Sequence, residues 1–167
     1  MAIRKTSIIA GTLLTALAAT NGSYGQTDLG WRRLDDPASG TRVEYPSKLF
    51  TVEEPSHSRG RPGQLFGTAD GRAHLAVFAV HDPRHRSAAA FIARNLRVPA
   101  ATLHYERTTA TFFALSGIHR DNIYYARCNS SPDHALLHCI NMVYPAQEKR
   151  RWDSIVTRIS RTLGAAQ

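Results

Sequence analysis

The chain has 167 residues, 43% of them hydrophobic, which is the size of one domain with a single ordinary core. Lys and Arg number 21 against 13 Asp and Glu, a formal net charge of +8. No internal repeat or low-complexity segment is visible, and no segment after residue 25 is apolar enough to cross a membrane. Repeat architectures and a transmembrane anchor in the rest of the chain are therefore excluded.

The first 25 residues have the three parts of a secretory signal peptide. Two basic residues, Arg4 and Lys5, precede the apolar stretch Ile8–Ala19, and small residues follow it. At about a dozen residues, this stretch is shorter than the roughly 20 residues that span a bilayer core. We expect cleavage after Gly25, with Ala16-Leu17-Ala18 as an upstream alternative, and export to the periplasm or beyond. A buried N-terminal helix or an uncleaved anchor is the other interpretation.

Without the two basic residues of that segment, residues 26–167 form one globular domain with 19 basic and 13 acidic residues, a net charge of +6. A basic surface suits nucleic acid, anionic lipid or acidic polysaccharide. Because an exported protein rarely meets nucleic acid and the basic residues are scattered, we expect no nucleic-acid partner. A solvated basic surface is the simplest interpretation, and adhesion to an anionic component of the cell envelope is the alternative.

The first half of this domain has mostly the patterns of β-strands. Alternating or continuously apolar residues predict strands over Thr41–Tyr45, Gln64–Thr68 and Arg72–Val80. The turn Ala69-Asp70-Gly71 joins the last two as a hairpin. Leu75–Val80 is apolar at every position, which predicts a central strand covered on both faces. Trp31 stands alone before a turn, and Glu53–Gly63 has the composition of a loop.

A mid-chain helix is predicted over Ser87–Leu96, with Ser87 as its N-cap and Pro99 beyond its end. Short connections after it favour an antiparallel meander, whose strands we expect over Leu103–Arg107, Thr111–Ile118, Asn122–Cys128 and Leu136–Tyr144. Adjacent aromatic residues such as Phe112 and Phe113 then place one ring on each face of the sheet.

Ala146–Leu163 has the clearest helical pattern in the chain. Its apolar residues recur at three- and four-residue spacing, as Trp152, Ile155, Val156, Ile159 and Leu163. We expect this stripe to cover the sheet with its basic side in water, and binding to a membrane surface is the alternative. The order of elements predicts an α+β fold, an α/β/α sandwich with a mostly antiparallel sheet of about six or seven strands. One mid-chain helix and this C-terminal amphipathic helix complete it.

Cys128 and Cys139 are the two cysteines of the chain. They fall on neighbouring predicted strands joined by the turn segment Asn129–His134, so a hairpin places them near each other. An even number of cysteines in an exported chain points to a disulfide. A redox pair, or a zinc site completed by His134 and His138, is the alternative.

Two resemblances agree with this layout. The early strand and the Tyr-Pro and Leu-Phe pairs of Val43–Phe50, followed by this order of elements, resemble the PsbP-like α/β/α fold. The second half is similar to small exported proteins of rhizobia and related alphaproteobacteria, on the segments Phe112–Gly117, Ile123–Tyr125, Tyr144–Lys149 and Trp152–Ser160. The resemblances imply a fold and an exported habitat, and the PsbP-like fold implies an accessory or assembly role through binding.

Eight histidines raise a catalytic or metal-binding hypothesis. His81 and His85 flank one turn, and His119 lies in another. Zinc needs further ligands, and Ser116-Gly117 lacks the Gly-x-Ser-x-Gly pattern of a nucleophile elbow. We therefore expect no catalytic set, no metal and no cofactor. A small hydrolase or metal-dependent enzyme that uses His81, His85 or His119 is the alternative.

The leading hypothesis is a non-enzymatic accessory or binding module for an envelope protein or an anionic polymer, which binds through its sheet edge or basic surface. Neighbouring predicted strands carry an aromatic series, namely Tyr105, Phe112, Phe113, Tyr124, Tyr125 and Tyr144. We expect most of these rings in the core. If one side of this sheet binds a ligand, the candidate surface comprises Arg107, Arg120, Arg127 and Tyr125.

Overall fold

The computed structural model describes residues 28–55, 63–81 and 88–166. The expected signal peptide lies outside the described residues, as do His85 and the expected N-cap Ser87. The elements are β1 (Trp31–Asp36), β2 (Thr41–Pro46), β3 (Phe50–Pro55), β4 (Gly63–Thr68), β5 (His74–His81), α1 (Ala88–Phe91), η1 (Ile92–Leu96), η2 (Ala100–Thr102), β6 (Leu103–Thr108), β7 (Phe112–His119), β8 (Asn122–Ser130), β9 (Leu136–Pro145), η3 (Ala146–Glu148), α2 (Lys149–Thr162) and β10 (Gly164–Ala165).

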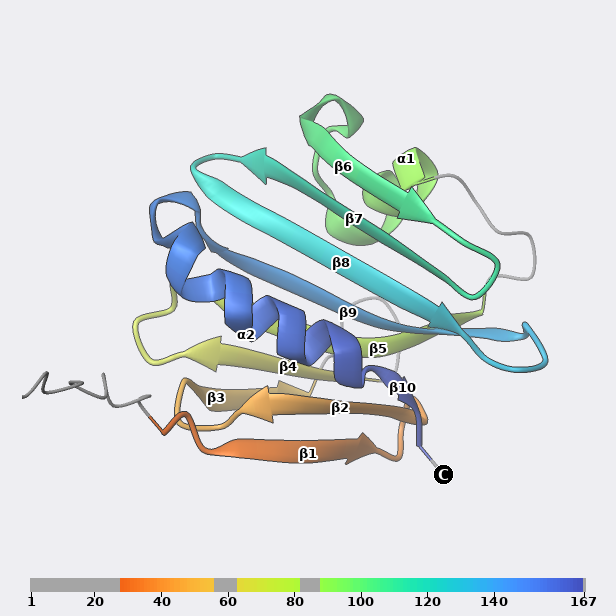
Figure 1. The fold of residues 1–167 in the computed structure, drawn as a ribbon, viewed down its shortest axis with the longest axis horizontal. Helices are drawn as coiled ribbons and strands as arrows, with labels where there is room; N and C mark the ends of the chain where they lie inside the picture. The colour runs from red at the N-terminus through yellow and green to blue at the C-terminus, as the bar shows by residue number, and fades with distance from the viewer. Residues whose placement is uncertain (1–27, 56–62, 82–87, 167) are drawn as a thin grey trace, which may run out of the picture.

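Seven strands form one antiparallel sheet in the order β3-β4-β5-β9-β8-β7-β6 (Figure 1). After β5 the chain crosses to the far edge as β6 and returns strand by strand until β9 pairs with β5. The predicted hairpin β4–β5 and the predicted meander β6–β9 are confirmed. A separate three-stranded sheet, β1-β2-β10, is completed by the C-terminal strand.

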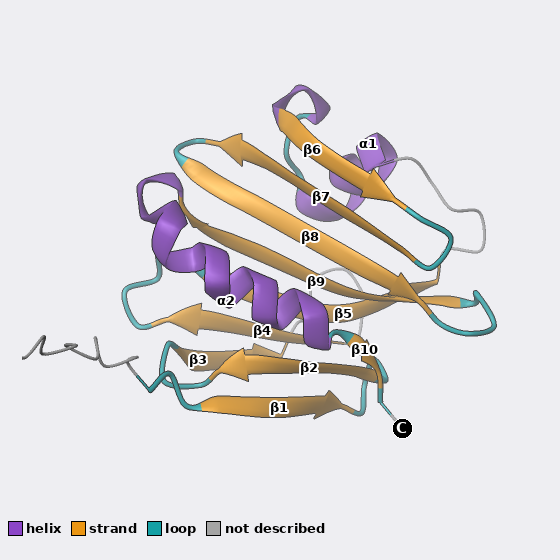
Figure 2. Cartoon of the chain, viewed as in Figure 1, coloured by secondary structure: helices purple, strands orange, loops and turns teal. Residues whose placement is uncertain are grey.

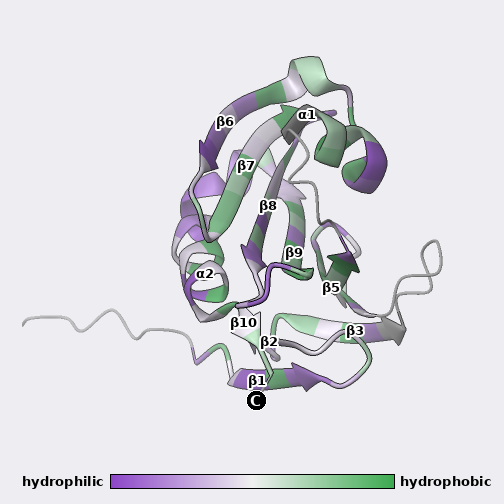
Figure 3. Cartoon of the chain, turned by 90° about the vertical axis from the view of Figure 1, so that its right-hand side faces the viewer, coloured by the Kyte–Doolittle hydropathy of each residue, from purple (hydrophilic) through white to green (hydrophobic). Residues whose placement is uncertain are grey.

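The sheets and helices form a layered sandwich (Figures 2 and 3). The helix α2 and the three-stranded sheet lie on one side of the seven-stranded sheet, which we call the α2 face. The turns α1 and η1 lie on the opposite side, the α1 face. Side chains of β5 are buried on both faces, as expected for a central strand. Within the described residues, no helix is both long enough and apolar enough to span a bilayer.

Trp152 anchors α2 to the seven-stranded sheet. The indole is 2% exposed, stacks on Tyr144 with ring centroids 5.3 Å apart, and lies 5.9 Å from the ring of Phe50. The rest of the predicted apolar stripe shares this core with Val43 of β2 and Leu75 of β5. Burial of each large apolar side chain contributes about 1.5–3 kcal/mol. The stripe therefore holds a helix and two sheets together.

The α1 face has its own core beneath α1 and η1. Phe113 of β7 meets Phe91 of α1 edge to face, with ring centroids 4.9 Å apart. The neighbouring Phe112 points to the α2 face, where two guanidinium groups lie over its ring. The prediction that these adjacent rings occupy opposite faces is confirmed.

The mid-chain helix predicted over Ser87–Leu96 does not form as one regular helix within the described residues. The described residues contain one α-helical turn, Ala88–Phe91, followed by the π-helical turn Ile92–Leu96. Arg97 then adopts a left-handed conformation with φ of 55°, and its N–H donates to the carbonyl of Ile92. Phe91 and Ile92 are buried, and the partly buried Leu96 packs against the same core.

The sequence pattern does not predict β1 and β3. The strand β1 has apolar residues at Trp31 and Leu34 alone, and it forms because it pairs with β2 along its whole length. The strand β3 continues to Pro55, inside the segment expected to be a loop, because it pairs with β4 as far as Gln64. A partner strand thus supplies the stabilisation that local composition lacks.

The disulfide expected between β8 and β9 is present. Cys128 and Cys139 are directly opposed in the register of the two strands and are bonded to each other. Both residues are fully buried on the α1 face. The bond therefore closes a short loop within the core.

We predict that Cys128→Ala/Cys139→Ala lowers the free energy of unfolding by roughly 2–3 kcal/mol, because the unfolded chain regains the entropy of the open loop. Urea unfolding of oxidised wild type and variant measures the difference. Added dithiothreitol should move the wild type towards the variant and leave the variant unchanged. Equal unfolding midpoints for the two oxidised proteins would contradict this prediction.

A buried hydrogen bond ties the three-stranded sheet to the seven-stranded sheet. His138 of β9 is 4% exposed, and its Nδ1 lies 3.0 Å from the hydroxyl oxygen of Thr41 on β2. Burial lowers the pKa of His138 below its ordinary value, and the charge of Asp133 opposes that shift. The folded protein therefore binds a proton at this site less readily than the unfolded chain does.

Stability should consequently decrease as the pH falls below about 6.5, the ordinary histidine pKa, because protons then favour the unfolded chain. His138→Gln cannot titrate and should lose less free energy of unfolding than the wild type between about pH 7 and about pH 5. The control His104→Gln, at an exposed histidine of β6, should keep the wild-type pH dependence. An equally steep acid loss in His138→Gln would assign the effect to another group.

Candidate binding face on strands β6 to β8

Opposed residues of β6, β7 and β8 bring alternate side chains of the three strands onto the same face. The set on the α2 face, which we call the arginine–aromatic strip, consists of Tyr105, Arg107, Phe112, Ala114, Ser116, Tyr125 and Arg127. In Figure 1, α2 crosses in front of β5 and β9, and no described element lies in front of β6 and β7. The strip is therefore uncovered on β6 and β7, whereas Tyr125 of β8 lies at the border with α2.

Two arginines enclose the ring of Phe112. The guanidinium carbon of Arg127 lies 4.0 Å from the ring centroid, and that of Arg107 lies 5.6 Å from it. Both distances are in the range of a cation–π interaction. The Nε of Arg127 also donates to Oδ1 of Asn129 at 2.9 Å, and the amide of Asn129 donates to the carbonyl of Leu163 at 2.8 Å. Arg127 is thus held in place, while Arg107 is exposed.

Neither arginine of the strip has a carboxylate partner among the described residues. Several other basic residues do pair with carboxylates: Arg158 binds Glu44, Arg42 binds Asp35, and Lys149 binds Asp153. The strip itself contains no acidic residue. Glu106 alternates with its neighbours and lies on the opposite face. The two guanidinium groups are therefore free to pair with an anion from outside.

Tyrosines lie at two borders of the strip. The hydroxyl of Tyr125 is 2.8 Å from Oγ of Ser160 on α2 and joins the helix to the sheet. Tyr105, on the outermost strand, is 47% exposed. Tyr125, predicted as a binding residue, therefore also has a structural role. Tyr105 is an exposed aromatic residue of the strip, and the surface predicted from the sequence does not include it.

Arg120 lies apart from the other predicted surface residues. It occupies the turn after β7 with φ of 48°, and its neighbour Asp121 has φ of 63°. Five strand positions separate Ala114, which stands opposite Arg107 and Arg127, from His119 at the end of β7. At about 3.4 Å a residue, Arg120 is roughly 20 Å from the other two arginines. It does not belong to the strip.

The described histidines of the enzymatic alternative, His81 and His119, lie far apart. His81 ends β5 opposite Leu136, whereas His119 ends β7 opposite Asn122 at the other end of the sheet. These two imidazoles cannot act on one substrate atom, and His85 lies outside the described residues. No group of three or more His, Cys, Asp or Glu side chains within residues 28–55, 63–81 and 88–166 could hold a metal ion.

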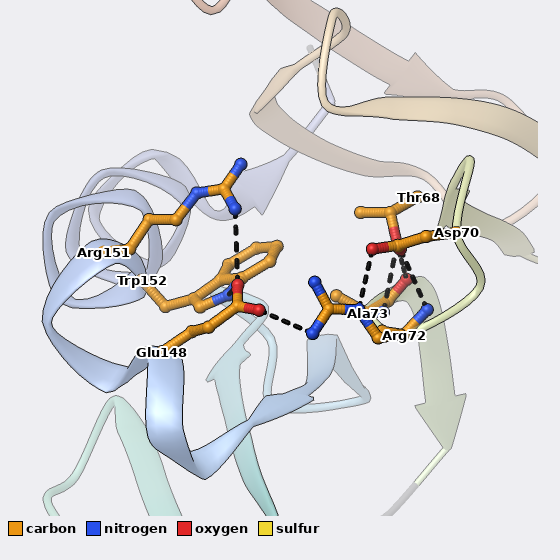
Figure 4. A network of polar contacts seen from close by, with 7 residues as sticks. All are labelled: Thr68, Asp70, Arg72, Ala73, Glu148, Arg151 and Trp152. Carbon is orange, nitrogen blue, oxygen red and sulfur yellow. Dashed lines mark hydrogen bonds and ion pairs between the residues drawn. The ribbon is translucent and has the colours of Figure 1, made fainter.

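A second polar cluster joins the β4–β5 turn to the start of α2 (Figure 4). Arg72 bridges two carboxylates, with its Nε 2.8 Å from Asp70 and a terminal nitrogen 2.7 Å from Glu148. The hydroxyl of Thr68 and the guanidinium of Arg72 hold the pKa of Asp70 well below its usual range. Glu148 also accepts a hydrogen bond from Nε1 of Trp152 at 3.4 Å.

This cluster borders a hollow of about 270 Å³. Its carboxylate oxygens already accept hydrogen bonds from groups of the chain itself. The cluster therefore acts as a structural joint between the hairpin and α2. Sequence reasoning finds only the Asp-Gly turn here, because Glu148 is distant along the chain and nothing local connects it to Arg72.

Comparisons with known proteins agree with the architecture. No protein-family model matches the sequence, and no curated protein matches it. The solution structure of cyanobacterial PsbP (CyanoP) from Synechocystis is similar, with a TM-score of 0.59 and 12% sequence identity. The match covers 84% of this chain and 95% of that chain. The fold is PsbP-like. At this identity a PsbP-like fold implies no activity, and the chemistry of the strip decides which partners it can bind.

The hydrogen bond between Tyr125 and Ser160 gives Tyr125 a structural role that can be tested separately from binding. We predict that Tyr125→Phe lowers the free energy of unfolding by about 1 kcal/mol, because Ser160 loses its hydrogen-bond partner beneath α2. Tyr105→Phe, on the same face, is the matched control and should leave stability unchanged, since its hydroxyl bonds no described residue. Chemical denaturation measures both. Equal effects of the two substitutions would show that the Tyr125–Ser160 contact contributes nothing.

Proposed function

We propose that this protein is an exported, non-enzymatic binding module of a bacterial periplasm that holds an anionic partner on the arginine–aromatic strip. Two guanidinium groups without carboxylate partners among the described residues, set around Phe112 on an uncovered sheet face, carry the proposal. Guanidinium groups bind carboxylates with two parallel hydrogen bonds. The ring of Phe112 keeps both cations near the face, and the terminal N–H groups of Arg127 are not used in its bond to Asn129.

Export is supported by two independent features. Residues 1–25 have the composition of a secretory signal. The bonded pair Cys128–Cys139 suits an oxidising compartment, where disulfides form and persist. The segments shared with small exported proteins of rhizobia, Tyr144–Lys149 among them, extend the proposal to an alphaproteobacterial envelope.

The shape of the strip favours binding rather than catalysis. Its side chains lie on a sheet surface, where Tyr105 and Arg107 are exposed to water. Water-exposed charges attract a partner and set its orientation, and salt screens that attraction. A partner with several carboxylates would find two cations, Arg107 and the hydrogen-bonded Arg127, and two tyrosine rings on one surface.

We predict that Arg107→Ala/Arg127→Ala weakens binding of poly-L-glutamate by about ten-fold, because two charge-assisted contacts are lost. Fluorescence anisotropy of a labelled polymer, at low salt and again at about 0.3 M salt, measures the affinity and its screening. Wild-type binding should weaken as salt rises. The double variant should respond less to salt.

The matched control is Arg150→Ala/Arg161→Ala, which removes the same charge from exposed positions of α2. It should keep at least a third of the wild-type affinity, since it changes only the general field of the protein. An equal loss of poly-L-glutamate affinity in both double variants would show that net charge alone causes the effect. The strip would then not be a binding site.

A further inference from the structure

The strand β6 is the open edge of the seven-stranded sheet. It pairs with β7 on one side, and no strand within the described residues lies on its other side. Every residue of β6 after Leu103 is exposed. Figure 3 shows β6 at the outer end of the sheet, beyond β7. The strip and a free sheet edge therefore adjoin each other.

One turn contact fixes which backbone groups of β6 point outward. The N–H of Thr109 donates to the carbonyl of Phe112 at 2.8 Å, and the register continues without interruption to the Tyr105–Ser116 pair. Hydrogen-bonded and non-hydrogen-bonded pairs alternate along an antiparallel ladder. Arg107 and Tyr105 therefore bond to β7 through their backbones, whereas Glu106 directs its N–H and C=O away from the sheet, as does Thr108.

This edge lacks most of the devices that protect edge strands. Such strands usually carry Pro or Lys, or bend away through a bulge. The residues of β6 include neither Pro nor Lys, and its irregularity falls at its start, between Leu103 and Tyr105. From Tyr105 to Thr108 the ladder is regular. A further strand meets no obstacle there among the described residues.

We infer that the anionic partner is an extended polypeptide segment that adds to β6 as an eighth strand of the sheet. This inference rests on the proposed function of the arginine–aromatic strip. The N–H and C=O groups of Glu106 and Thr108 bond the backbone of the added strand. Its side chains alternate between the two faces. Those on the α2 face lie beside Tyr105 and Arg107.

Charge complementarity defines the sequence of that segment. Arg107 attracts carboxylates to the α2 face, whereas Glu106 on the α1 face repels them. The segment therefore has acidic residues at every second position and uncharged or basic residues between them. A polyanion without backbone amides satisfies the arginines but leaves the edge of β6 unpaired, which makes a polypeptide the better fit.

The experiment compares Glu106→Pro with Glu106→Gln in the full exported chain. Proline removes the outward N–H and blocks the edge, yet it leaves the bonds to β7 intact because Glu106 does not contribute an N–H to them. Glutamine removes the same charge and keeps the N–H. The probe is a labelled eight-residue peptide of alternating Glu and Thr, and its affinity is measured by fluorescence anisotropy.

Glu106→Pro should weaken binding of this peptide by about ten-fold, while Glu106→Gln binds at least as well as the wild type. A block peptide, four Glu followed by four Thr, should bind more weakly than the alternating peptide. The fully N-methylated alternating peptide should lose binding to the wild type. This last measurement needs no variant, so it decides the matter even where Glu106→Pro fails to fold.

The opposite results overturn the inference. If the N-methylated and block peptides bind as tightly as the alternating one, or polyacrylate of equal charge displaces it from wild type and Glu106→Pro alike, no strand is added. If, with those results, Arg107→Ala/Arg127→Ala still binds poly-L-glutamate more weakly than the wild type, the strip remains a site for an anionic polymer. If that double variant binds normally while Glu106→Pro does not, the edge binds peptides and the proposed function of the strip fails.

Discussion

The apolar stripe of α2 is the contact on which the rest of this structure depends. Trp152 packs on Tyr144 of β9, and the following turns of the helix share their core with β2 of the three-stranded sheet. Arg158 adds to this side, because it lies 4.2 Å from the ring centroid of Trp31 and 2.8 Å from Glu44. Without the helix, each sheet would expose an apolar face to water. The two sheets are therefore stable as one unit.

The same packing determines which part of the sheet stays open. After α2, Leu163 is extended and β10 pairs at once with β2. Asn129 of β8 also donates to the carbonyl of Leu163, which fixes the end of the helix against the sheet. The helix is thus held against β9 and β8, beside the three-stranded sheet (Figure 1). The part of the arginine–aromatic strip on β6 and β7 is uncovered because the only long helix of the described residues extends no further than β8.

Features with a strong local period could be predicted from the sequence, and features held by distant partners could not. The stripe of α2, the central strand β5 and the bonded pair Cys128–Cys139 follow from spacing within single segments. The strands β1, β3 and β10 depend on pairing, and the Arg72–Glu148 bridge depends on the fold as a whole. Side chains alternate along strands, so the sequence predicts that Arg107 and Arg127 share a face. No such rule predicts the position of Arg120, which lies in a turn.

The surroundings of Phe112 are not those that would stabilise the fold most. A phenylalanine on a strand gains most when it packs on other apolar groups, as the partly buried Phe113 does against Phe91. Phe112 instead lies on the uncovered face, where its partners are two cations that could pair with solvent or an anion equally well. Its ring holds both guanidinium groups at cation–π distance without neutralising them. Departures of this kind from the rules of stable packing are characteristic of binding sites.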